Sequence, residues 1–149
     1  MKKHLLLLFV FFFSCTLWAY DIVKDNFSYN IDDITKTATV VDYDDSNLDI
    51  LGMVINQREI YHDGEIYKIT SIGDNAFDFC HEIKDITIPR TVTKIGNAAF
   101  YACSNLEYIR HSCVLTSLGE GALDETLWLS NQPNGCVYFG NCFKHSPII

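Results

Sequence analysis

Small and apolar residues recur along this chain with a fixed 23-residue period between Ile69 and Thr126. Each repeat carries an aliphatic residue, a glycine, an alanine, a large apolar residue and a cysteine in the same order. The three sets are Ile72, Gly73, Ala76, Phe77 and Cys80, then Ile95, Gly96, Ala99, Phe100 and Cys103, then Leu118, Gly119, Ala122, Leu123 and Thr126. A unit this short cannot bury its own apolar face and needs a neighbour to cover it. The pattern therefore predicts a repeat solenoid over residues 69–129.

Each position in the repeat predicts a local structure. The glycine predicts a corner where a side chain would clash or where φ is positive. The alanine, aromatic and cysteine positions predict inward side chains over about one helical or 3₁₀ turn. Stretches rich in β-branched residues, 86–88 and 91–95, precede the corners and predict strands of a parallel ladder.

Residues 86–89 (Ile-Thr-Ile-Pro), 92–100 and Cys103 resemble the BspA-type leucine-rich repeat of bacterial and protist surface proteins. The resemblance covers residues 69–129 well and the flanks loosely, and it implies a leucine-rich-repeat solenoid with a role in adhesion or recognition. The second repeat departs from the pattern, because His111-Ser112 stands where the first has Ile-Pro. The third repeat lacks the aromatic residue and the cysteine.

The segments on either side of the repeats predict hairpins. Residues 27–31 and 37–41 alternate at period two, and residues 60–62 and 65–67 flank Asp63-Gly64, a strong two-residue turn signal. We expect a turn-rich link over 42–49 and an N-terminal hairpin cap over 20–68, because the raw end of a solenoid needs covering.

Beyond the repeats, residues 136–139 and 142–144 flank Gly140-Asn141 and predict a hairpin that closes the other end over 130–149. BspA-type arrays are often interrupted by a segment like Trp128 to Tyr138 before the repeats resume. The chain reaches Ile149 soon after this segment, so a truncated array is an open alternative.

The first part of the chain, residues 1–19, predicts a secretory signal peptide. Lys2, Lys3 and His4 precede an unbroken apolar run over 5–13, and Ala19 offers a small residue for cleavage. The alternatives are an uncleaved anchor, for which the apolar run is short, and a lipoprotein acylated at Cys15. Cleavage leaves residues 20–149, enough for one domain, and moves the formal net charge from −8 to −10 because two lysines are lost.

This acidic balance argues against nucleic acid and anionic membranes as partners. We also expect no membrane-spanning segment after the signal peptide is cleaved. Five cysteines remain after cleavage, an odd number that cannot pair completely. Cys80 and Cys103 would lie in one column of successive coils with side chains in parallel. We expect them to be buried thiols that pack as small hydrophobes.

No pattern predicts a cofactor, a metal or a catalytic centre. A calcium loop starting at Asp42 would need glycine at its sixth position and glutamate at its twelfth, where the chain has Asn47 and Met53. Cysteine and histidine lie close in Cys80-His81 and His111-Ser112-Cys113, without the spacing of four zinc ligands. A hydrolase that uses Cys113 and His111 stays as a minor alternative.

The remaining candidate is a surface. The outward positions of two successive strands are Asp85 and Thr87, then Tyr108 and Arg110, and tyrosine and arginine often carry interface energy. We therefore expect an exported, non-enzymatic module that recognises an extracellular protein or cell-surface ligand through this strand face. The alternative is a structural spacer or part of a longer surface array.

Overall fold

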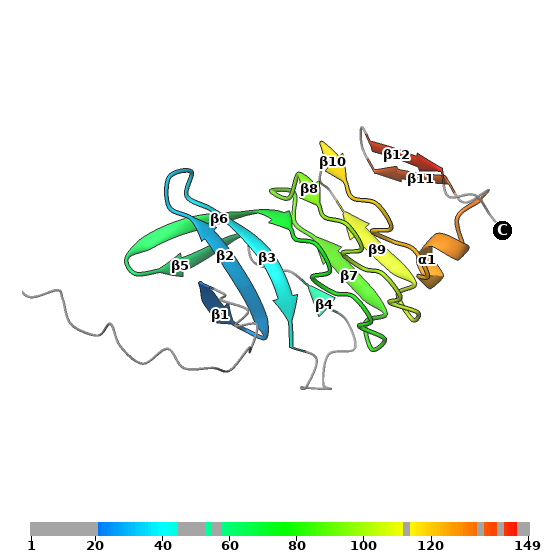
Figure 1. The fold of residues 1–149 in the computed structure, drawn as a ribbon, viewed down its shortest axis with the longest axis horizontal. Helices are drawn as coiled ribbons and strands as arrows, with labels where there is room; N and C mark the ends of the chain where they lie inside the picture. The colour runs from blue at the N-terminus through cyan, green and yellow to red at the C-terminus, as the bar shows by residue number, and fades with distance from the viewer. Residues whose placement is uncertain are drawn as a thin grey trace, which may run out of the picture.

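The computed structural model describes residues 21–44, 53–54, 58–111, 114–133, 136–139 and 142–145, in a mostly β fold (Figure 1). The strands are β1 (Ile22–Lys24), β2 (Phe27–Asp32), β3 (Thr37–Tyr43), β4 (Met53–Val54), β5 (Glu59–His62), β6 (Glu65–Ile72), β7 (Asp85–Ile88), β8 (Lys94–Ile95), β9 (Tyr108–His111), β10 (Ser117–Leu118), β11 (Cys136–Phe139) and β12 (Cys142–His145). The helix α1 (Leu127–Ser130) follows β10. No helix within these described ranges has the length and hydrophobicity to cross a bilayer.

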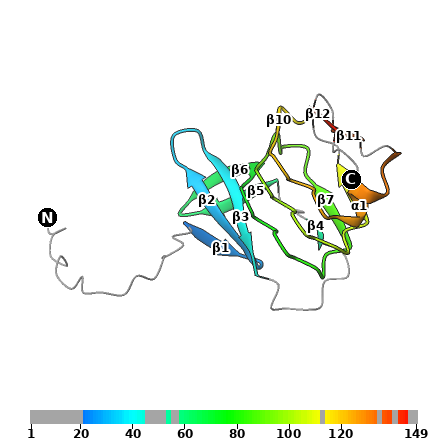
Figure 2. The same ribbon diagram turned by 45° about the vertical axis from the view of Figure 1, so that its right-hand side comes forward.

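Two parallel ladders run through the repeats, side by side in Figures 1 and 2. In the first ladder, β6, β8 and β10 pair in order, with Ile72 beside Ile95 and Ile95 beside Leu118. In the second, β4, β7 and β9 pair in order, with Ile86 beside Ile109. Both registers reproduce the 23-residue period, so the predicted parallel pairing is confirmed. The strand predicted over 91–95 is shorter than expected, because β8 contains only Lys94 and Ile95.

The connecting segments are stacked turns, and each contains the single i→i+3 turn predicted near the cysteine position, as in the bond from Cys80 N to Phe77 O at 3.3 Å. None of them continues into a longer helix. Two positions in each repeat have left-handed backbone: Asn75, Ala98 and Gly121 at one, and Phe79, Ala102 and Glu125 at the other, with φ between 48° and 61°. A left-handed residue interrupts a right-handed helical turn. The freed amides bond to the next coil instead, as from Phe77 N to Ala99 O at 2.8 Å.

The recurring glycines lie where one coil touches the next. A Cβ built on Gly96 would be 2.5 Å from Asp74 N, and one built on Gly119 would be 2.1 Å from Gly96 C. Neither residue has positive φ, which among the repeat glycines is found at Gly121. Of the two predicted reasons for the corner glycine, the clash is the one that applies.

The aromatic column lies in the core. The Phe77 and Phe100 rings are stacked with centroids 5.0 Å apart and planes 7° apart, and both side chains are fully buried. On the other side of Phe77 lie Phe27 at 6.2 Å and Tyr43 at 5.9 Å, from β2 and β3. Of the predicted core residues, Ile72, Ala76, Phe77, Cys80, Ile95, Ala99, Phe100, Cys103, Ala122 and Leu123 are buried, and Leu118 is partly buried.

The three predicted hairpins form as β2–β3, β5–β6 and β11–β12. Strand β3 also pairs in parallel with β6, placing Val40 beside Ile72, and β4 pairs with β7, placing Met53 beside Ile86. The link predicted over 42–49 is therefore partly wrong, because β3 continues to Tyr43. Residues before the first repeat thus add one rung to each ladder.

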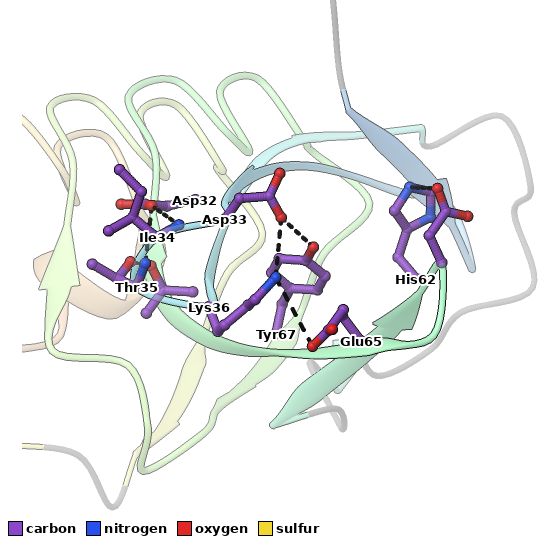
Figure 3. Close-up of polar contacts among 10 residues, drawn as sticks. Asp32, Asp33, Ile34, Thr35, Lys36, His62, Glu65 and Tyr67 are labelled. Atoms are coloured by element: carbon purple, nitrogen blue, oxygen red, sulfur yellow. Dashed lines mark hydrogen bonds and ion pairs between the residues drawn. The ribbon is translucent and has the colours of Figure 1, made fainter. Parts of the chain in front are cut away.

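A polar cluster holds the loop between β2 and β3 against β6 (Figure 3). Asp33 Oδ1 accepts a hydrogen bond from the Tyr67 hydroxyl at 2.5 Å and forms an ion pair with Lys36 Nζ at 3.3 Å. The Tyr67 hydroxyl, followed by Lys36, lowers the pKa of Asp33. Lys36 Nζ also lies 3.9 Å from Glu65 Oε2 and 5.1 Å from the centre of the Tyr67 ring.

Cys80 and Cys103 are buried thiols and no disulfide joins them, as predicted. Cys103 Sγ donates to the carbonyl oxygen of Phe77 at 2.9 Å. Burial, helped by the neighbouring Cys80, raises the pKa of Cys103 to about 12. Burial also raises the pKa of Tyr29, on β2, to about 12.

These raised pKa values predict alkaline destabilisation. Below pH about 8 both groups are mostly neutral in the folded and unfolded chain, so neither makes stability depend strongly on pH. Above pH about 9 the unfolded chain releases the Cys103 proton first, and the free energy of unfolding falls by up to about 1.4 kcal/mol per pH unit for each such group. Urea unfolding between pH 9 and 11 should show this slope.

The Cys103→Ala variant is the control for this prediction. Its slope between pH 9 and 10 should be smaller than that of the parent by about one group's contribution, whatever its absolute stability. Equal slopes in the two proteins would show that Cys103 does not hold its proton in the folded state.

Candidate ligand-binding face

The four predicted face residues come together on β7 and β9. The strands pair so that Asp85 lies beside Tyr108 and Thr87 beside Arg110. Along β7 and β9, the alternate residues Ile86, Ile88 and Ile109 are buried in the core. The period of two therefore places the predicted set on the outer side of the sheet, on adjacent strands.

An ion pair joins the two charged residues of the predicted set, Asp85 and Arg110, which the sequence did not indicate. Arg110 Nη1 forms an ion pair with Asp85 Oδ2, diagonally across the two strands. The Asp85 side chain is only 19% exposed, whereas Arg110 is 66% exposed. Asp85 Oδ1 is buried and has no hydrogen-bond partner. Arg110 is thus held in place by a carboxylate beneath it, with much of its surface left open to solvent.

Tyr108 is the large exposed side chain of this face, with 53% of its surface open. Hydrogen bonding to Glu107 and the charge of that carboxylate raise the pKa of Tyr108. The phenol therefore stays neutral and keeps its proton at neutral pH. Together with Arg110 it offers an aromatic ring, a hydroxyl and a guanidinium, which are groups suited to the centre of a protein interface.

The other candidate chemistry gains no support in the described ranges. These residues contain no group of three or more histidine, cysteine or acidic side chains able to hold a metal ion. Cys80 is buried and His81 Nδ1 contacts Ser104 Oγ at 3.1 Å. Cys113 lies outside the described residues, so the pairing proposed with His111 stays untested.

One surface feature was not singled out from the sequence. Phe79, His81 and Tyr101 form an aromatic cluster on the turns, with Phe79 5.6 Å from Tyr101 and 6.2 Å from His81 between ring centres. Phe79 and His81 are exposed, and Tyr101 is partly buried. The sequence feature that could have identified this cluster is a departure from the repeat. Ala102 and Glu125 occupy the position of Phe79 in the following coils.

Comparisons with known proteins agree with this geometry. Residues 65–148 match the family described as BspA type leucine rich repeat region (6 copies). No curated protein matches the chain. A leucine-rich repeat protein of Bacteroides capillosus is 27% identical, with a TM-score of 0.57 over 62% of this chain and 67% of that one.

Two longer structures are also similar. A leucine-rich repeat protein of Bacteroides ovatus is 28% identical, with a TM-score of 0.57 over 72% of this chain and 33% of that one. A leucine rich cell surface protein of Faecalibacterium prausnitzii A2-165 is 22% identical, with a TM-score of 0.58 over 72% of this chain and 30% of that one. The chain therefore spans about a third of these two relatives, and none of the three descriptions is that of an enzyme. With its 23-residue register and a family match over more than half its length, the chain belongs to the BspA-type leucine-rich repeat family.

Proposed function

We propose that this protein is an exported, non-enzymatic recognition module that binds a protein or cell-surface ligand through the outer face of β7 and β9. The observation that carries the proposal is the exposed pair of Tyr108 and Arg110, with Arg110 held by Asp85. Pre-positioned side chains lose less conformational entropy on binding than mobile ones. A parallel ladder and the partly buried carboxylate of Asp85 supply this pre-positioning.

The module is a short solenoid in which hairpins cover both ends. Support at the N-terminal end comes from Phe27 and Tyr43, which pack on Phe77 of the first repeat. At the other end the β11–β12 hairpin follows α1. Covering the ends of so short an array would keep its apolar columns from water.

Export through a cleaved signal peptide of residues 1–19 is part of the proposal. Its support is the basic start followed by the apolar run over 5–13, which lie outside the described residues. The description of the Faecalibacterium prausnitzii relative as a cell surface protein agrees with that location. Attachment as a lipoprotein through Cys15 remains the alternative route to the surface.

The test is to capture ligands from the surroundings of the organism with the mature chain and then measure the affinity of variants for the captured protein. Tyr108→Ala should weaken binding at least about thirtyfold, as expected for an aromatic anchor worth about 2 kcal/mol. Tyr61→Ala is the matched control, because Tyr61 is also an exposed strand tyrosine, at 66%, but lies on β5. An unchanged affinity of the Tyr108→Ala/Arg110→Ala double variant would reject this face.

A second candidate is a spacer within a longer surface array. This candidate is favoured because the chain spans only about a third of the length of two similar structures. In that case no ligand would depend on Tyr108. Repeats continuing in the gene beyond Ile149 would favour the spacer.

A further inference from the structure

The turns form an acidic edge that is chemically distinct from the strand face. We define the turn edge as residues 73–83, 96–106 and 119–126, the connecting segments of three successive coils. It contains no lysine or arginine and six exposed acids: Asp74, Asp78, Glu82, Glu120, Asp124 and Glu125. The basic residues of the repeats, Lys84, Arg90, Lys94 and Arg110, all lie in the intervening strand segments.

An exposed aromatic ring lies within this edge. Phe79 is 58% exposed and has φ of 56°, a backbone conformation unfavourable for a bulky side chain. Its backbone N donates to Tyr101 O at 2.9 Å, so the conformation is fixed by the stacking of the coils. Ala102 has the same conformation in the next repeat without an aromatic side chain. Packing of the repeats therefore does not account for a phenylalanine here.

Acidic groups lie around the same aromatic cluster. The Tyr101 hydroxyl donates to Glu125 Oε1 at 2.8 Å, from one coil to the next. Glu125, and more weakly Asp124, raise the pKa of Tyr101, which places both carboxylates near this ring. Asp78 precedes Phe79 and is exposed. The edge thus combines open aromatic surface with negative charge, which is the combination that attracts arginine and lysine by cation–π and ionic contacts.

We propose that the turn edge around Phe79, Tyr101 and Glu125 is a second docking surface, which takes a basic segment of a protein partner. An arginine or lysine of that segment packs on the Phe79 ring and pairs with the carboxylate of Glu125. The carboxylates of Asp78 and Asp124 attract further basic residues on either side. This surface is independent of the strand face, since it lies on the turns. Its charged groups are carboxylates, whereas the exposed charged group of the strand face is the guanidinium of Arg110.

The experiment measures binding of a fluorescent twelve-residue Gly-Arg repeat peptide to the mature chain by fluorescence anisotropy. We expect saturable binding that weakens as salt is raised from about 0.05 to about 0.5 M, because exposed charges are then screened. Phe79→Ala should weaken binding about fivefold through loss of the cation–π contact. Glu125→Gln, which keeps the size of the side chain, should also weaken it several-fold.

Two controls separate this proposal from the strand-face proposal. Tyr108→Ala should leave binding of the Gly-Arg peptide within about twofold, and a Gly-Ser peptide of the same length should not bind. The proposal is overturned if Phe79→Ala binds the Gly-Arg peptide as the parent does, or if Tyr108→Ala causes the same loss. Binding of a neutral oligosaccharide in place of the basic peptide would also overturn it. An unchanged affinity of Phe79→Ala for the Gly-Arg peptide would overturn this proposal and leave the strand-face proposal standing.

Discussion

A Gly119→Ala variant is expected to lose about 3 kcal/mol or more of its free energy of unfolding, a large part of what a small domain has. The added Cβ would lie 2.1 Å from Gly96 C and 2.2 Å from Asn97 N, both backbone atoms of the preceding coil. Backbone cannot move aside as a flexible side chain can, so the two coils would have to separate. Their hydrogen bond from Gly119 N to Ile95 O, now 2.7 Å, would lengthen. Urea unfolding followed by circular dichroism measures the loss.

The glycines of the chain supply graded controls for this prediction. Gly73→Ala should cost less than Gly119→Ala, since its nearest neighbour would be Val40 O at 3.1 Å. Gly121→Ala should cost about 1 kcal/mol, because φ there is 61° but the added Cβ would meet only the Asp124 side chain, with Oδ2 at an ordinary contact distance of 3.5 Å. A Gly119→Ala protein no less stable than Gly121→Ala would show that the coils are not in close backbone contact.

A Phe100→Ala variant is expected to lose about 3–5 kcal/mol, the usual cost of truncating a buried phenylalanine. Phe100 is fully buried, and its ring stacks on Phe77 in the preceding coil. The third repeat has Leu123 at this position, so no second aromatic ring replaces the lost contact on the far side. The measurement is again urea unfolding, with an unchanged m-value as the check that the folded state is intact.

Phe79→Ala is the matched control for the core variant, because it removes the same type of side chain from a neighbouring position of the turns. It should change stability by less than about 0.5 kcal/mol, since the ring is 58% exposed. Equal losses from Phe79→Ala and Phe100→Ala would contradict the burial of the aromatic column.

The repeats were predictable from sequence because a single period fixes both the register and the inward side chains. Once Ile72 pairs with Ile95, the columns of glycine, alanine and phenylalanine follow without further information. The rungs before the first repeat were not predictable in this way. Val40 and Ile72 are paired, but their separation along the chain is longer than the 23-residue period on which the prediction depends.

The left-handed residues of the turns were not predicted, because they carry no consistent sequence signal. Asn75 and Gly121 are residue types that favour this conformation, but Ala98 occupies the same position between them. In the candidate face, alternation in the strands placed Asp85, Thr87, Tyr108 and Arg110 on the outer side. It did not reveal the diagonal ion pair of Asp85 with Arg110, since cross-strand geometry decides which side chains meet.

The stacking of successive 23-residue coils is tested most directly by a double-mutant cycle between Phe77 and Phe100. The two single alanine variants and the double variant are unfolded in urea, and the coupling free energy is obtained from the four values. Rings stacked at 5.0 Å predict a favourable coupling of about 1 kcal/mol. Additive losses, with coupling indistinguishable from zero, would contradict the contact between coils on which both proposed surfaces depend.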